Sequence, residues 1–111
     1  MATTFSNFRA GYLMTLGNNT LISTSSGERK SISQFVLYNS STSNVVVSFW
    51  LVGAGTGTVD TNVLDRVTVL PRRSVVVGKL VSQVLSPSFT LIGNADTANV
   101  IVVNASGVTE T

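Results

Sequence analysis

The chain of 111 residues contains no cysteine and no histidine. Their absence excludes disulfide bonds, thiol nucleophiles, zinc fingers and the Ser-His-Asp arrangement of many hydrolases. Acid-base catalysis by carboxylates is also poorly supplied, because the 5 Asp and Glu residues are scattered along the chain. The sequence therefore predicts a protein that is not an enzyme and that binds no cofactor and no metal ion.

Charge is scarce as well, since charged residues make up 11% of the chain, against about 25% in a typical soluble domain. A monomer in water uses surface charge to stay soluble, whereas a subunit covered by neighbours needs less of it. The composition therefore favours assembly, although abundant Ser, Thr and Asn could also solvate a surface. A net charge of +2, from cations spread between Arg9 and Lys79, argues against a nucleic-acid partner.

Long apolar runs are missing too. No stretch approaches the roughly 18 apolar residues of a membrane helix, and the N-terminal MATTFSNFRA lacks the apolar region of a secretory signal. A chain without cysteine suits the reducing cytoplasm as its place of synthesis. We therefore expect no membrane partner.

What the sequence does contain is a series of short runs rich in Val, Ile, Leu, Phe and Thr, separated by Gly, Asn, Ser and Pro. Such runs are typical of β-strands joined by turns. They predict an all-β protein, an antiparallel β-sandwich that is jelly-roll-like and has about eight strands. Residues 1–11 are interpreted as an N-terminal arm and residues 12–111 as the sandwich domain. The expected strands are 12–16, 20–24, 31–39, 45–52, 63–70, 74–77, 80–85, 89–92 and 100–105.

The segment VVVSFWLV, residues 45–52, is apolar on both faces of its expected strand. One face carries Val45, Val47, Phe49 and Leu51, and the other carries Val46, Ser48, Trp50 and Val52. The outer face of a two-sheet sandwich should be polar, so the second apolar face needs a cover. A partner subunit is the simplest cover, with Val46, Trp50 and Val52 in the contact; an ordinary core position is the alternative for Trp50. The same doubling recurs at residues 75–77 and 100–103.

Two aromatic residues of the expected arm, Phe5 and Phe8, either dock on a neighbouring subunit or fold back onto the domain. Arg72 and Arg73 form a basic cluster beside Pro71. These two cations either keep a loop tip soluble or dock on an acidic surface of a partner.

Two further patterns are weak. The glycine-rich segment 53–57 follows a strand, but it lacks the glycine spacing of a dinucleotide loop and no helix is expected after it. Asp60, Asn62 and Asp65 could supply oxygen ligands to a cation, yet their spacing matches no calcium loop. A flexible connection between strands is the preferred interpretation of this region.

Five segments together resemble small virion structural proteins of tailed bacteriophages. Their shared features are turns and core strands, among them a strand ending in Leu-Val before a glycine-rich loop and a closing Ser-Gly-Val. The segments are GERKSISQFVLYNSS (27–41), VVVSFWLVGAG (45–55), NVLDRVTVL (62–70), LVSQVLSPSFTLIG (80–93) and VIVVNASGVTE (100–110).

This resemblance implies a structural protein of a phage virion, made in the host cytoplasm and located on the virion. The preferred role is capsid decoration by an oligomer, expected to be a trimer, that contacts itself and other virion proteins such as the major capsid protein. The alternative is a tail, fibre or baseplate component. A carbohydrate-binding module for host adsorption, using Trp50 or Tyr38, belongs to this alternative.

Overall fold

The computed structural model describes residues 2–53 and 63–111. Nine β-strands occur in these ranges and no helix does, so the all-β prediction is confirmed. A helix long and apolar enough to cross a membrane is accordingly not found in them. The strands are β1 (Thr3–Leu13), β2 (Gly17–Ser23), β3 (Arg29–Asn39), β4 (Val45–Val52), β5 (Val63–Val69), β6 (Ser74–Val76), β7 (Val84–Leu85), β8 (Thr90–Ala95) and β9 (Ile101–Glu110).

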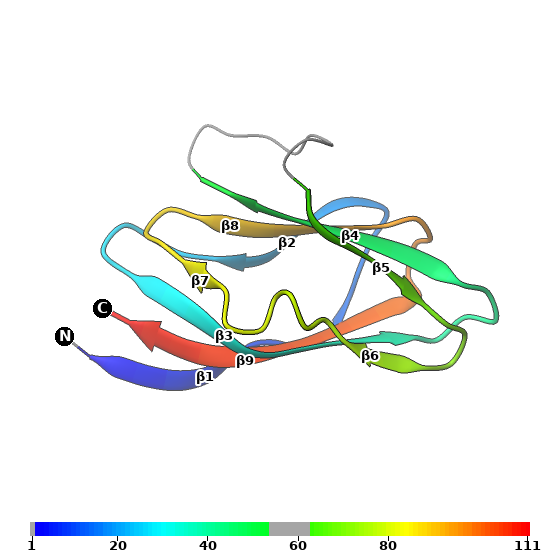
Figure 1. Ribbon diagram of the computed structural model, residues 1–111, viewed down its shortest axis with the longest axis horizontal. Coiled ribbons are helices and arrows are strands. Elements are labelled where there is room, and N and C mark those ends of the chain that lie inside the picture. The colour runs from blue at the N-terminus through cyan, green and yellow to red at the C-terminus, as the bar shows by residue number, and fades with distance from the viewer. Residues whose placement is uncertain (1, 54–62) are drawn as a thin grey trace.

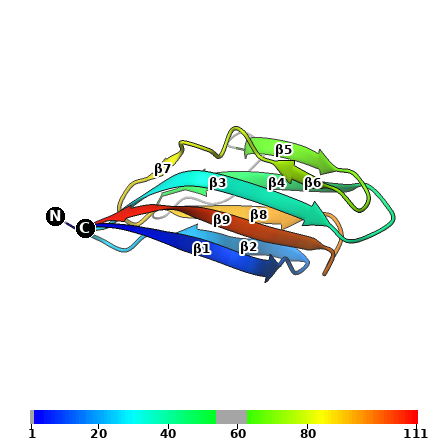
Figure 2. The same ribbon diagram turned by 90° about the horizontal axis from the view of Figure 1, so that it is seen from below.

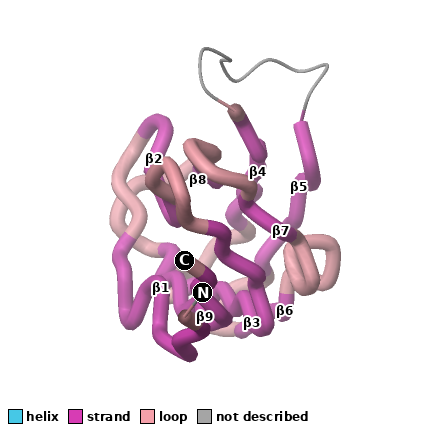
Figure 3. The backbone as a smooth tube through the Cα atoms, turned by 90° about the vertical axis from the view of Figure 1, so that its left-hand side faces the viewer, coloured by secondary structure: helices cyan, strands magenta, loops and turns pink. Residues whose placement is uncertain are grey.

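The strands form two sheets that lie one above the other (Figure 1). Sheet A has the order β1-β9-β3-β6, with the short strand β7 also paired to β3, and sheet B has the order β2-β8-β4-β5. Neighbouring strands within each sheet are antiparallel. The end view of Figure 3 shows the two layers, with β1, β9, β3 and β6 along one side and β2, β8, β4 and β5 along the other. The predicted antiparallel, sandwich-like architecture is confirmed.

The strand pairs are nested along the chain. β4 pairs with β5, β3 with β6, β2 with β8 and β1 with β9. In this order, the two strands of each pair flank the previous pair along the chain. The chain therefore behaves as one long hairpin that is rolled into two layers, and its two ends meet in the β1–β9 pair. The N- and C-termini lie together at one end of the molecule (Figure 2).

The core lies between the two sheets and is built from alternate residues of the long strands. Phe35 of β3 and Phe49 of β4 are fully buried, and their rings meet edge to face with centroids 5.4 Å apart. Burying each such side chain contributes about 1.5–3 kcal/mol. Val45 and Val47 belong to the same core cluster and Leu51 packs against it, which confirms the predicted inner face of β4.

The predicted N-terminal arm is corrected for residues 3–11, because these residues belong to strand β1. β1 pairs with β9 along its whole length, with irregularities after Asn7 and after Arg9. Arg9 then crosses to sheet B, where its guanidinium donates to the carbonyl oxygens of Leu21 at 2.8 Å and Thr20 at 2.7 Å. The sequence concealed this strand because most of its side chains are exposed and therefore lack the apolar alternation of a half-buried strand.

Two other expectations were wrong at strand ends. The expected strands leave the segments 17–19 and 93–95 as connections, yet these segments pair with each other in β2 and β8. Conversely, most of the expected strand 80–85 is a looped segment in which Ser82 has a positive φ of 74°. Leu80 and Leu85 of this segment are fully buried, so it fills the core without forming a long strand. The apolar content of residues 80–85 indicated correctly that part of the segment is buried, but it could not show which backbone hydrogen bonds the segment forms.

Candidate docking surface

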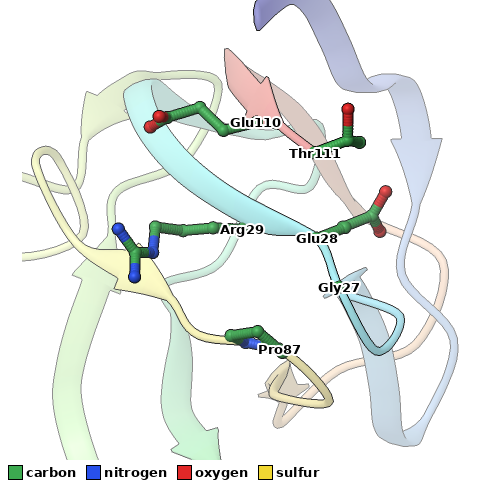
Figure 4. A pocket seen from close by; sticks show the side chains of 6 residues that line it. All are labelled: Gly27, Glu28, Arg29, Pro87, Glu110 and Thr111. Atoms are coloured by element: carbon green, nitrogen blue, oxygen red, sulfur yellow. The ribbon is translucent and has the colours of Figure 1, made fainter. Parts of the chain in front are cut away.

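In the described parts of the chain, no three acidic side chains lie close enough together to hold a metal ion. A shallow hollow of about 200 Å³ lies at the end of the molecule that carries the termini. It is lined by Gly27, Glu28, Arg29, Pro87, Glu110 and Thr111. Figure 4 shows the side chains of Glu28 and Thr111 pointing to one side and that of Arg29 to the other. The lining groups do not converge on one point, so this hollow has no evident ligand.

Glu28 is instead part of a turn. Its carboxylate accepts a hydrogen bond of 3.0 Å from the backbone N–H of Ser25 and forms a 3.6 Å ion pair with Lys30. The hydrogen bond from Ser25, followed by the charge of Lys30, lowers the pKa of Glu28 below its ordinary value of 4.5.

A pH-dependent contribution to stability follows from this lowered pKa. The ionised carboxylate stabilises the fold above the unfolded pKa, and this contribution is lost as the pH falls through the lower, folded pKa. We expect Glu28→Gln to reduce the free energy of unfolding slightly at neutral pH and to have no effect in strong acid. Urea unfolding at both pH values measures the difference. An equal effect at both would show that the side chain acts by packing rather than by charge.

The broad candidate surface is the outer face of sheet A, here called face A. Ile101, Val103 and Ala105 of β9 are buried, so the residues between them point outward. The strand register aligns the outward side chains of β9 in rows with side chains of β1, β3, β6 and β7, which therefore also point outward. The apolar members of face A include Phe5, Leu13, Val36, Tyr38, Val76 and Val102.

Exposed apolar side chains concentrate on face A. Large hydrophobic residues that are exposed in the described ranges are Phe5, Leu13, Leu16, Leu70, Val76 and Val84. Four of these, Phe5, Leu13, Val76 and Val84, lie on face A, and Phe5 and Val76 have 81% and 58% of their surface exposed. Exposed apolar residues that gather on one face are typical of a binding surface, whereas scattered single ones are ordinary.

Face A is also uncharged over most of its length. The outward row at one end of the sheet contains Arg29 and Glu110, which face each other in the β3–β9 register. The following rows are built from apolar, hydroxyl and amide side chains. The polar members include Asn7, Gln34, Asn104 and Ser106, which line a shallow hollow between β1, β9 and β3. A surface of this kind avoids the large cost of burying unpaired charges, while its amide and hydroxyl groups need hydrogen-bond partners in a contact.

The outer face of sheet B is different. Its outward side chains include Asn94, which donates to Asn18 at 2.9 Å, and Arg66, which donates to Ser48 at 2.9 Å. None of the large exposed hydrophobic residues of the described ranges comes from β2, β8, β4 or β5. The outer face of sheet B thus carries hydrogen-bonded polar pairs and no large exposed hydrophobic residue from its described strands, so the two outer faces of the molecule differ.

The residues that the sequence predicted for the subunit interface are not brought together. Val46, Trp50 and Val52 do point away from the core, on the outer face of sheet B, as the alternation of β4 predicted. Trp50 and Val52 are nevertheless only 8% and 6% exposed in the single chain. A partner subunit is thus not needed to cover these two side chains. The doubled apolar patterns at 75–77 and 100–103 were the better signal, because they place Val76 and Val102 on face A.

Phe5 and Phe8 also lie in different environments. Phe5 is on face A, whereas Phe8 is half-buried, packs against the core and lies beneath the ammonium group of Lys30, 5.5 Å from its ring centre. The two residues therefore follow different alternatives: Phe8 folds back onto the domain, and Phe5 stays available to a partner.

The basic pair lies at the turn that joins β5 to β6, where Arg72 adopts a positive φ of 56°. Both arginine side chains are exposed, and the carbonyl of Arg73 accepts a 3.0 Å hydrogen bond from the N–H of Asn39. Docking of Arg72 and Arg73 on an acidic partner stays a prediction. Of the weak patterns, residues 54–62, including Asp60 and Asn62, lie outside the described residues, and Asp65 is paired with Lys79 at 3.9 Å.

Comparison of the chain with protein-family models, with curated proteins and with solved structures gives no match. The fold and the surface therefore define the class of protein at a coarse level. It is an all-β protein of two antiparallel sheets, with one neutral and partly apolar outer face.

Proposed function

We propose that this chain is a non-enzymatic structural subunit that attaches to other structural proteins through face A. The observation that carries the proposal is the presence of the exposed Phe5, Leu13, Val76 and Val84 on one sheet face that is uncharged over most of its length. Removing such side chains from water contributes about 25 cal/mol for each Å² of apolar surface that is buried, and part of this gain offsets the entropy lost on association. A second support is the low charge of the whole chain, 11%, which suits a protein surrounded by neighbours.

Face A could form most of one side of a specific protein-protein contact. β1 and β3 are each 11 residues long, and four strands cross the sheet from β1 to β6. β9 and β6 contribute 10 and 3 residues. At about 3.3 Å per residue and 4.8 Å between strands, the four strands cover roughly 550 Å². A specific protein-protein contact buries about 800 Å² on each partner. Face A alone is thus somewhat smaller than such a contact, so adjoining loops would supply the remaining area.

For the setting, we propose a jelly-roll fold and a place on a phage virion. The nested pairs β4–β5, β3–β6, β2–β8 and β1–β9 support a jelly roll, in which a long hairpin of eight strands rolls into two sheets. Viral capsid proteins are among the proteins that use this fold, although a fold alone does not fix a function. The resemblance to small virion proteins of tailed phages points the same way.

Within the virion, the preferred role is decoration of the capsid, with the major capsid protein and further copies of this chain as partners. The alternative is a tail, fibre or baseplate component. Labelling intact virions with an antibody to this chain distinguishes the two. Label spread over the head supports decoration, label confined to the tail supports the alternative, and unlabelled virions that lack the protein would contradict both.

Charge placed on face A should prevent attachment. We expect Val76→Asp to weaken binding of the purified chain to capsid shells by at least tenfold, because the contact would bury a carboxylate without a partner. Co-sedimentation of the chain with shells measures the binding. The matched control is Thr20→Asp, which adds the same charge to an exposed position of β2. Equal binding by both variants would show that face A is not the contact.

A carbohydrate-binding role is supported by one observation. The hollow on face A is lined by the amides of Asn7, Gln34 and Asn104, and Tyr38 lies half-buried on the same face. Amide groups and aromatic rings are groups with which proteins recognise sugars. Trp50, the other residue proposed for this role, is largely buried and is a poor platform for a sugar ring. A glycan array tests the role, and it should be repeated with Gln34→Ala if a sugar binds.

A further inference from the structure

Strand β1 leaves one of its two edges unpaired. It is the terminal strand of sheet A, with β9 on one side only. Figure 2 shows it along the margin of the molecule. The five residues from Thr3 to Asn7 are all exposed, and their pairing with β9 is regular. This short segment therefore presents a straight strand edge to solvent.

The direction of the free backbone groups follows from the register. Ala2 and Thr111 exchange both backbone hydrogen bonds, at 3.3 and 3.0 Å. In an antiparallel ladder, hydrogen-bonded and non-hydrogen-bonded pairs alternate. Counting along the β1–β9 register, Thr4 and Ser6 bond to β9, while Thr3, Phe5 and Asn7 direct their N–H and C=O groups away from it. These three residues hold the unused donors and acceptors of the edge.

The other sheet edges in the described ranges are protected against further pairing. The edge strand β2 has carbonyl groups capped by Arg9, which binds Thr20 and Leu21, and by Lys30, which donates to Ser23 at 2.7 Å. β5 carries charges at 65 and 66, and β6 and β7 have only 3 and 2 residues. Charge, short length and capping are the usual devices that stop edge-to-edge association. The segment from Thr3 to Asn7 has no charge, no proline and no irregularity.

We infer that this segment pairs with the same segment of a second copy of the chain. An antiparallel register centred on Phe5 places Phe5 opposite its counterpart and Thr3 opposite Asn7 of the other copy. Each of these pairs would exchange two hydrogen bonds, because all three residues have their backbone groups free. The same sequence thus supplies both sides of the contact, as a twofold axis requires.

The side chains support this register. Phe5 is 81% exposed, and cross-strand partners lie on the same face of a sheet, so the two Phe5 rings would meet on face A. The two copies would form one continuous sheet with both face A surfaces on the same side. The result is a dimer, whereas the trimer expected from the sequence needs another contact. The inference deepens the proposed function by naming the contact between copies, but its test requires no virion.

Proline substitution separates edge pairing from folding. In Thr3→Pro/Asn7→Pro the lost N–H groups point outward, so the β1–β9 ladder keeps its hydrogen bonds. We expect the dissociation constant of the dimer, measured by analytical ultracentrifugation, to rise at least tenfold. The matched control, Thr3→Val/Asn7→Val, keeps both N–H groups and should dimerise as the unaltered chain does. Thermal unfolding of both variants verifies that they fold.

A disulfide provides an independent test of the register, since the chain has no cysteine. Opposed residues of an antiparallel pair have Cα atoms about 5.5 Å apart, which suits a disulfide. Phe5→Cys should therefore give a covalent dimer on mild oxidation, and Leu13→Cys, exposed on the same strand but outside the paired segment, should not. A monomeric unaltered chain at high micromolar concentration, or equal crosslinking of both variants, would overturn the inference. A dimer that fails to bind capsid shells would contradict only the proposed function.

Discussion

Gly107→Ala is expected to destabilise the fold by about 3 kcal/mol, which corresponds to a fall in Tm of roughly 10 °C or more. Gly107 lies in β9 between Ser6 of β1 and Ile32 of β3. A methyl group there would overlap the backbone carbonyl oxygen of Ser31 and come within 2.8 Å of the Phe8 ring. The carbonyl is part of the sheet, so it cannot move aside as a flexible side chain would. Thermal or urea unfolding measures the loss.

The control for this substitution is Gly78→Ala. A methyl group on Gly78 meets no atom within 4 Å, and its φ is not positive. We expect the free energy of unfolding to stay the same or to rise slightly, because alanine restricts the unfolded chain. If both substitutions have small effects, β1, β9 and β3 are not packed as closely at Gly107 as described, and the position of Phe8 would be in question.

Asn19→Ala is expected to cost about 3 kcal/mol, because this side chain is a buried centre of hydrogen bonds. Asn19 is 3% exposed. Its Oδ1 atom accepts from the N–H and hydroxyl of Thr15 and from the hydroxyl of Tyr12, at 2.9–3.0 Å. Its Nδ2 group donates to the carbonyls of Thr15 and Gly17 at 2.9 and 3.0 Å. The substitution leaves these groups without a partner and detaches the end of β1 from β2.

Asn94→Ala is the matched control, since Asn94 donates to Asn18 in an exposed pair on the outer face of sheet B. Water replaces such a bond at little cost, so we expect a change below about 0.5 kcal/mol. Chemical unfolding of the two variants under the same conditions compares them directly. Similar losses would mean that water reaches the Asn19 side chain and that the hydrogen bonds around it contribute little.

Asn19 also illustrates where sequence interpretation failed. The run of Gly17, Asn18 and Asn19 has the composition of a turn, and the expected strands 12–16 and 20–24 leave it as a connection. The structure pairs this run with 93–95 of β8, more than seventy residues away, and buries the Asn19 amide. Local propensity favours a turn, but the strand that pairs with the backbone of this run is β8, far along the chain, and no local pattern reveals that pairing.

The candidate surface was predicted only in part. The sequence indicated that apolar residues lie on both faces of some strands, and Val76 and Val102 on face A agree with that pattern. It selected Trp50 as the anchor because tryptophan is a frequent anchor of interfaces. The sequence could not show that a single chain already covers Trp50, since exposure depends on which segments fold over a strand.

The sequence by itself determined the class of structure. Short β-branched runs broken by Gly, Asn and Ser can bury their apolar side only as sheets, and Val45, Val47 and Phe49 face the core as their alternation required. Tertiary structure alone decided the order of the strands, the entry of residues 3–11 into sheet A and the difference between the two outer faces. The physical reason is that these features depend on pairing between distant segments. Alternation tells which side of a strand is apolar, but the segments that fold over the strand decide which apolar side meets water.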